Sequence, residues 1–191
     1  MRVATLSEML EEVVRLGEAT GMEAHAHEMR GELEGRIATV RAAVADAGRP
    51  RVVALRSLEP PRAGGFWIPE MVSIAGGEDV AGDPGLNPPE VGWGELASLG
   101  ADVVIVMPDG ATADAKAQAM EHWEQLAALG AGHAFALDPA ASFAEPGPRL
   151  VDGIELLAHL LHPELFDPPA NANFVPLAAP VTGAPPPERG Y

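Results

Sequence analysis

The chain has 191 residues, 47% of them hydrophobic and 5% aromatic, so it is long enough for one well-buried domain and short for two. Its formal net charge of −16 argues against nucleic acid and anionic membrane surfaces as partners, since both are bound by clustered Lys and Arg. The absence of cysteine excludes disulfides, thiolate metal sites, a cysteine nucleophile and a lipid-modified cysteine anchor within these residues.

No stretch approaches the 18 or so consecutive apolar residues of a membrane-spanning helix, so we expect no membrane insertion. The N-terminus, MRVATLSEMLEEVV, has acidic residues where an export signal needs an uninterrupted apolar stretch. As written, the chain is therefore expected to be cytoplasmic. The alternative is an extracytoplasmic protein whose true N-terminus is missing.

The N-terminal region predicts two helices. Thr5 and Glu8 fit a capping box, and the first helix closes at Gly21. A second, unusually long helix is expected over residues 22–48, ending at a Gly-Arg-Pro stop. The first helix carries an apolar stripe of Leu6, Met9, Leu10 and Val13, which must fold back on the domain or pair with a second copy.

Residues 49–166 alternate between strands and helices. Strands are expected at 51–55, 102–107 and 133–137, and their continuous apolar runs indicate a parallel sheet buried on both faces. Helices are expected at 69–75, 93–99, 112–129 and 148–161. The pattern predicts an α/β, Rossmann-like three-layer lobe. Residues 167–191 are rich in Pro and Ala, and we interpret them as a loosely ordered tail.

Motifs for catalysis or metal binding are not found. His25 and His27 are two residues apart and point to different sides of a helix, so they cannot chelate one ion. His159 and His162 suit capping or packing near a helix C-terminus. No HExxH, P-loop or GxSxG occurs, so we predict no catalytic and no metal residues. An enzyme whose catalytic groups are assembled only in space is a weaker alternative.

Two glycine-rich turns come closer to ligand chemistry. Gly76 and Gly77 follow a helix and lack a nearby Lys, so we interpret them as a helix C-cap rather than a phosphate loop. Residues 64–71, GGFWIPEM, instead leave the carboxyl end of the first strand.

Phe66, Trp67, Asp109 and Phe143 all lie in loops that follow strands. Because the carboxyl ends of parallel strands meet at one edge of a sheet, we expect these four residues to gather at a ligand site there. Rings on a glycine-flexed loop suit a large, flat, partly apolar ligand. The alternative is that Trp67 only covers the core.

Four stretches between residues 49 and 166 carry a family resemblance: RPRVVAL, EPPRAGGFWIPEMVSIAGGEDV, DVVIVMPDG and FAEPGPRLVDGIELLAHLLHPELF. Their order and spacing resemble the C-terminal lobe of class III, helical-backbone substrate-binding proteins of ABC importers, particularly the cobalamin-binding branch. Residues 1–21 resemble the last helix of the N-terminal lobe, and 22–48 the helix that joins the lobes. The resemblance implies that the rest of the N-terminal lobe is missing here.

The resemblance implies non-covalent binding of a cobalamin-like corrinoid, either cobalamin or cobinamide, as a ligand and not a cofactor. Phe66, Trp67 and Phe143 would contact the ring system, and Asp109 would accept hydrogen bonds from its amides. Glu145 would stand at the cleft mouth, where the family often has an arginine.

The resemblance also implies a partner, an ABC permease or a chain that supplies the missing lobe. The family often has a glutamate at the position of Ser73 for docking on permease arginines, and here Glu70, one turn earlier, is the candidate. The alternative function is a protein-interaction module that keeps the lobe fold and pairs with another chain without binding a ligand.

Overall fold

A mostly parallel sheet forms the middle layer of the protein. The computed structural model describes residues 3–108, 112–170 and 172–178. The strands of these residues lie in the order β2-β1-β4-β5-β6, and β3 also pairs with β1. Their bounds are β1 Arg51–Leu58, β2 Pro61–Ala63, β3 Glu78–Asp79, β4 Val103–Val106, β5 His133–Leu137 and β6 Phe174–Pro176. The pairs of β1 with β3 and β4, and of β4 with β5, are parallel, as expected.

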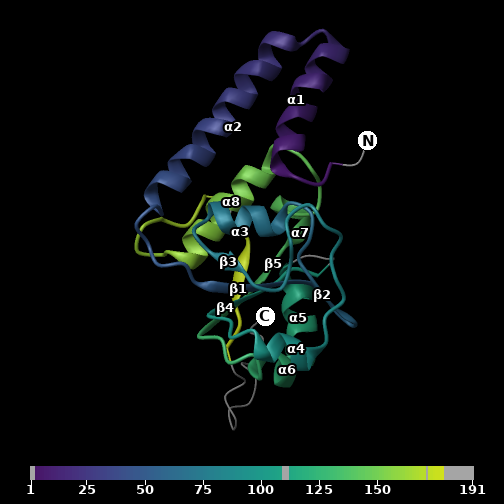
Figure 1. Cartoon of the computed structure of the whole chain (residues 1–191), viewed down its shortest axis with the longest axis vertical. Helices are drawn as coiled ribbons and strands as arrows, with labels where there is room; N and C mark the ends of the chain where they lie inside the picture. Colours follow the sequence, from purple (N-terminus) through teal and green to yellow (C-terminus); the bar gives the residue numbers. More distant parts are fainter. Residues whose placement is uncertain (1–2, 109–111, 171, 179–191) are drawn as a thin grey trace, which may run out of the picture.

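Helices cover both faces of this sheet (Figure 1). On one face lie α1 Leu6–Thr20, α2 Glu23–Ala43, α3 Ile68–Ile74 and α8 Arg149–Leu161. On the other lie α4 Trp93–Ser98, α5 Thr112–Glu121 and α6 Trp123–Ala127. The short α7, Pro139–Ser142, follows β5. The predicted α/β three-layer architecture is confirmed.

Alternate strand residues supply two separate cores. Val52 and Ile105 face α3 and α8, whereas Val53 and Val104 face α4 to α6, and all four are buried. A strand buried on both faces has no solvent side to encode, so its sequence shows no alternation. This is why the continuous apolar runs predicted these strands correctly.

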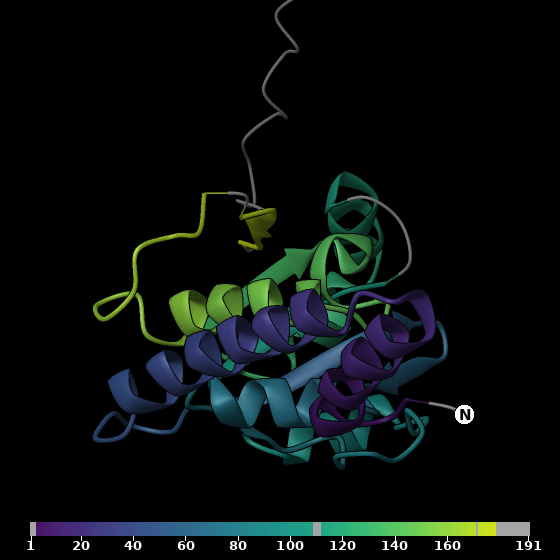
Figure 2. The ribbon, with the colours of Figure 1, turned by 90° about the horizontal axis from the view of Figure 1, so that it is seen from above.

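The α1–α2 hairpin lies against α3 and α8, with α2 running beside α8 (Figure 2). The predicted capping box is present, because Glu8 N donates to Thr5 Oγ1 at 3.2 Å and Thr5 N donates to Glu8 Oε2 at 3.2 Å. Gly21 ends α1 with a φ of 70°. Leu6, Met9 and Leu10 are buried, so the apolar stripe of α1 folds back on the domain.

Several elements differ from the sequence prediction. α2 ends at Ala43 rather than near residue 48, and the helix expected over 112–129 is interrupted between Glu121 and Trp123. The prediction of a loosely ordered tail over residues 167–191 was wrong in part, because Phe174–Pro176 pairs with β5 as the antiparallel strand β6. Such a strand of three residues is specified by its partner's free edge rather than by a pattern of its own.

Candidate functional site

The loop that follows β1 and β2 is fixed by backbone hydrogen bonds to β1 and to the segment around Leu86. Gly64 N donates to Ala54 O at 2.7 Å, and Phe66 N donates to Leu86 O at 2.7 Å. A Cβ added at Gly65 would stand 2.5 Å from the backbone nitrogen of Pro88, so only glycine fits there. Phe66 itself has a φ of 54°, in the left-handed region that side chains other than glycine rarely adopt.

Trp67 joins this loop to the segment after β5. Its Nε1 donates to the Phe143 carbonyl oxygen at 2.9 Å, and its ring centroid lies 5.8 Å from that of Phe66. Trp67 is 5% exposed and Phe143 is 2% exposed, and both belong to the core between the sheet, α3 and α8. The indole thus buries its apolar body while its single donor is satisfied.

The structure therefore brings together three of the predicted ligand residues, Phe66, Trp67 and Phe143. The rings of Trp67 and Phe143 lie in the core beneath this surface. For Trp67 this agrees with the alternative interpretation, in which the indole only covers the core. Phe66 is half-buried and Glu145 is exposed, so these two side chains present surface to solvent. Asp109 lies outside the described residues. The ligand-binding roles of all five stay predictions.

Glu70, the predicted docking residue, makes a contact that sequence analysis missed. Leu6 N donates to Glu70 Oε2 at 2.9 Å, so this half-buried carboxylate supplies an acceptor to a free N–H at the start of α1. Leu6 and Glu70 are 64 residues apart, and no local pattern encodes the pair. One carboxylate oxygen of Glu70 is thus engaged within the chain, and docking on a partner stays a prediction.

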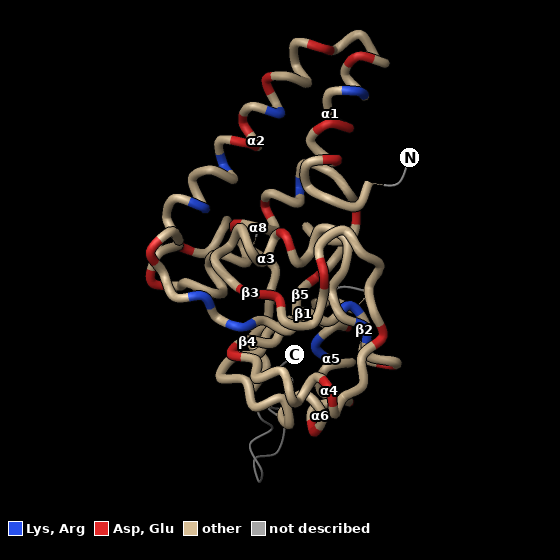
Figure 3. Tube along the Cα trace, in the orientation of Figure 1, with Lys and Arg blue, Asp and Glu red and all other residues tan. Residues whose placement is uncertain are grey.

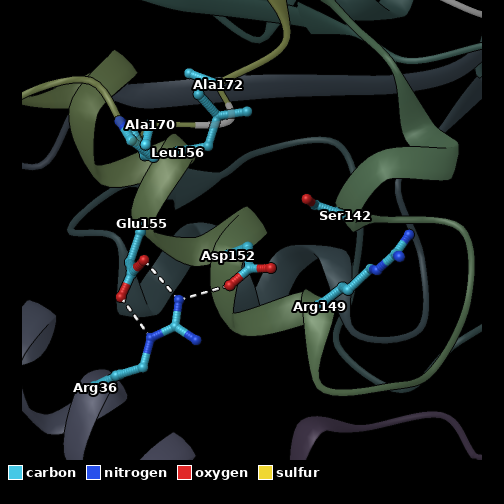
Figure 4. Close-up of a pocket in the computed structure, with 9 residues that line it drawn as sticks. Arg36, Ser142, Arg149, Asp152, Glu155, Leu156, Ala170 and Ala172 are labelled. Carbon is cyan, nitrogen blue, oxygen red and sulfur yellow. Dashed lines mark hydrogen bonds and ion pairs between the residues drawn. The ribbon is translucent and has the colours of Figure 1, made fainter.

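Two neighbouring pockets flank the start of α8. A pocket of about 280 Å³ is lined by Phe143, Glu145 and Arg149, and one of about 430 Å³ by Arg36, Ser142 and Arg149 among others. Figure 4 shows Ser142 and Arg149 on the same side of the larger pocket. Arg149 is exposed, and in the described part of the chain it makes no hydrogen bond or ion pair.

Arg36 lines the larger pocket but is occupied by carboxylates. Its Nε and Nη2 donate to the two carboxylate oxygens of Glu155 at 2.8 and 2.7 Å, and Nη2 also donates to Asp152 at 2.6 Å (Figure 4). The hydrogen bonds to Glu155 are the main cause that raises the pKa of this guanidinium. The bidentate pair links α2 to α8, so Arg36 holds the long helix on the lobe.

Asp79, which the sequence analysis did not single out, has the most unusual titration among the carboxylates of the described residues. Burial raises its pKa to about 6, although the N–H groups of Ala81 and Gly82 both donate to its Oδ1 at 3.0 Å. The charge of nearby Asp83 adds to the rise. Its other oxygen is buried without a partner in the described structure. Asp79 anchors the segment 80–90, which runs over the Gly64–Phe66 loop.

The remaining sequence predictions concern caps, metals and membranes. Gly77 N donates to Val72 O, Gly76 N donates to Ser73 O, and Gly76 has a φ of 88°, so the pair does cap α3. Among the described residues, no three His, Asp or Glu side chains gather closely enough to hold a metal ion. None of the helices in these ranges is both long and apolar enough to cross a bilayer.

Comparison with protein families assigns this fold. The model of a family described as periplasmic binding protein matches residues 2–141. The chain belongs to this family, whose members are non-catalytic binding proteins, and the prediction that the chain is not an enzyme is therefore confirmed. A search of the curated proteins found no match.

Solved structures show the same fold at low sequence identity. An ABC transporter substrate-binding protein from Listeria monocytogenes EGD-e is 19% identical, with a TM-score of 0.74 over 84% of this chain and 66% of that one. S. aureus IsdE complexed with heme is 18% identical, with a TM-score of 0.72 over 84% and 66%. The periplasmic vitamin B12 binding protein BtuF of Vibrio cholerae is 20% identical, with a TM-score of 0.67 over 84% and 62%. The chain thus spans less than two thirds of the length of these structures.

Proposed function

We propose that the chain is a substrate-binding component of an ABC importer and that its ligand is a cobalamin-like corrinoid. Membership in the periplasmic binding protein family is the observation that carries the class of function. The corrinoid rests on the resemblance of residues 49–166 to the cobalamin-binding branch. The similar structures include both a vitamin B12 binding protein and a heme complex, so two tetrapyrrole types must be compared.

The carboxyl edge, meaning residues 64–67 and 138–149 in the loops after β1–β2 and β5, supports this proposal. It combines the half-buried Phe66 ring, the exposed Glu145 and Arg149, which has no partner among the described residues, beside the buried rings of Trp67 and Phe143. Apolar surface with a few polar groups is the usual composition of a ligand site. Phe66 contacts the apolar rim of the macrocycle, and Glu145 accepts hydrogen bonds from its amide groups.

A visible-band titration tests the proposal, with cobinamide, cobalamin and heme added separately to the full chain. We expect saturable spectral shifts with the corrinoids, and weaker binding for Phe66→Leu. Phe166→Leu is the matched control, because Phe166 is also half-buried against the same core but lies beyond the far end of α8. A shift with heme alone would replace the corrinoid as the ligand.

Glu145 allows a sharper test within the corrinoids. A carboxylate accepts hydrogen bonds from amides but repels a phosphate, so we expect cobinamide to bind more tightly than phosphate-containing cobalamin. Glu145→Arg should narrow or reverse that preference. Equal binding of both ligands by the wild type and this variant would remove Glu145 from the site.

The second candidate function is an interaction module that pairs with another chain and binds no ligand. The burial of Trp67 and Phe143 favours it, because both rings are satisfied within the core of this chain. Failure of all three tetrapyrroles to bind would support this candidate. Light scattering at several concentrations would then show whether the chain pairs with itself.

A further inference from the structure

A second pocket, of about 440 Å³, lies at the opposite edge of the sheet from the carboxyl edge. Its lining residues include Val103 and His133, the first residues of β4 and β5, and Leu161, the last residue of α8. We call it the amino-edge pocket. None of its lining residues belongs to the carboxyl edge, and the proposed corrinoid function does not use it.

Four ring side chains lie in a continuous row in this pocket. The rings of His133 and Phe135 stack at 6.4 Å with an interplanar angle of 10°. Phe135 then meets Phe174 edge to face at 6.0 Å, and Phe174 meets His159 at 5.8 Å. Phe135, Phe174 and His159 are half-buried and His133 is exposed, so each ring has surface open to a ligand.

The charges around these rings favour a cation. Asp102 and Glu164 line the pocket, and the described residues that line it include no Lys or Arg. The carboxylate of Asp102 accepts from Arg51 N at 2.8 Å, while the Arg51 guanidinium is directed to the carbonyls of Leu99 and Gly100. The C-terminal end of α8 adds its partial negative charge.

The histidine nearest that helix end is oriented by the backbone. His159 Nδ1 lies 2.8 Å from the Phe166 carbonyl oxygen, which can only accept, so Nδ1 carries the hydrogen. In the neutral ring this leaves Nε2 as an acceptor. The ring therefore adds electron-rich surface to the pocket.

We propose that the amino-edge pocket binds a small organic cation, with an alkylated ammonium group resting against the rings of Phe135 and Phe174. Aromatic faces attract such a group through their quadrupole, and the alkyl substituents suit the apolar lining better than a bare metal ion would. A pocket of about 440 Å³ has room for a ligand of this size. The net charge of −16 raises the local concentration of cations around the whole molecule.

The test compares choline with 3,3-dimethylbutan-1-ol, its uncharged isostere, by NMR titration of the full chain at pH about 8, where imidazole rings are neutral. Both molecules have the same shape and the same apolar surface, so any difference in affinity reports the positive charge of choline. We expect choline to bind at least about tenfold more tightly than the uncharged alcohol, because the aromatic rings attract that charge. Equal affinities would reduce the site to an apolar groove and overturn the proposal. Failure of both molecules to bind would also overturn it.

Single-residue variants test whether choline binds in the amino-edge pocket. Phe174→Leu should weaken choline binding at least about fivefold. Glu164→Gln should weaken it only about twofold, because the Glu164 carboxylate is more exposed than the Phe174 ring and its charge is screened by water. Glu164→Gln is at the surface and leaves the core intact, so it tests the site even if Phe174→Leu perturbs β6. Glu124→Gln, on the α4–α6 face, is the matched control and should bind as the wild type does. Unchanged choline binding in both pocket variants would overturn the assignment.

Discussion

The carboxyl edge and the amino-edge pocket hold their aromatic rings in different ways. At the carboxyl edge, Trp67 and Phe143 are almost fully buried and are joined by the hydrogen bond from the indole. In the amino-edge pocket, Phe135 and Phe174 are half-buried and their rings meet edge to face. The first pair stabilises the fold, and the second leaves ring surface free for contact.

The rings that stabilise the fold are therefore different from the rings that are available for binding, although both pairs lie along the same sheet. The residues that sequence analysis selected for ligand contact include the best-packed rings of the carboxyl edge, so ligand contact there falls mainly to Phe66 and Glu145. Acidic residues alone do not distinguish the two edges, because Asp and Glu are distributed over the whole molecule and are mixed with Lys and Arg along α1 and α2 (Figure 3). Burial and hydrogen bonding do.

The largest expected effect follows from replacing the buried indole. Trp67→Ala should lower the free energy of unfolding by about 3–5 kcal/mol, because a fully packed ring is replaced by a cavity and the Phe143 carbonyl loses its donor. Urea denaturation measures the change. A melting temperature close to that of the wild type, combined with lost corrinoid binding, would show that Trp67 faces the ligand instead.

The next effect concerns the backbone approach beside Phe66. Gly65→Ala should cost about 1–3 kcal/mol, since the new methyl group would stand 2.5 Å from Pro88 N and 2.8 Å from Leu86 O. Gly94→Ala is the control, because a Cβ at Gly94 meets nothing within 4 Å. Equal stability of the two variants, measured by the same denaturation, would mean that residues 86–88 move away freely.

Asp79 gives a smaller effect that depends on pH. Its pKa is about 6 in the folded chain, above the ordinary value of 3.8, so the folded state binds this proton more tightly than the unfolded state. The charged form therefore costs stability above pH about 6, and the cost disappears as the pH falls toward about 4. Asp79→Asn should stabilise the protein by about 1–2 kcal/mol at pH about 7.5 and by much less near pH 4.

Denaturation at both pH values measures this difference. Asn keeps an oxygen for the Ala81 and Gly82 N–H groups, so the turn itself is retained. Asp46→Asn is the control, because Asp46 is exposed and remote from Asp79 in sequence, and it should change stability by only a few tenths of a kcal/mol. A variant of Asp79 that is less stable than the wild type at pH 7.5 would show that its carboxylate has a favourable partner.

The smallest effect is expected in the amino-edge pocket. Phe174→Ala should lower the free energy of unfolding by only about 1 kcal/mol, because the ring is half-buried and lies on the short strand β6. Thermal unfolding of this variant beside Trp67→Ala measures the contrast directly. Similar losses in the two variants would contradict the distinction between a structural pair of rings and an available one.

The sequence by itself determined the long helices, the three parallel strands β1, β4 and β5, and their order. Apolar runs predicted β1, β4 and β5, and the Thr5–Glu8 capping box and the Gly76–Gly77 cap marked two helix ends. These features depend on neighbours within a few residues, which a single sequence displays. The order of the four stretches over residues 49–166 likewise pointed to the binding-protein family before any contact was known.

Only the tertiary structure decided which polar and aromatic groups meet. Glu70 reaches the start of α1 across 64 residues, and Trp67 donates to Phe143 across 76. β6 exists because β5 offers it a free edge, and Asp79 has a raised pKa because the fold buries it. Each of these depends on the burial and distance of residues remote in sequence, and neither quantity is contained in local periodicity or composition.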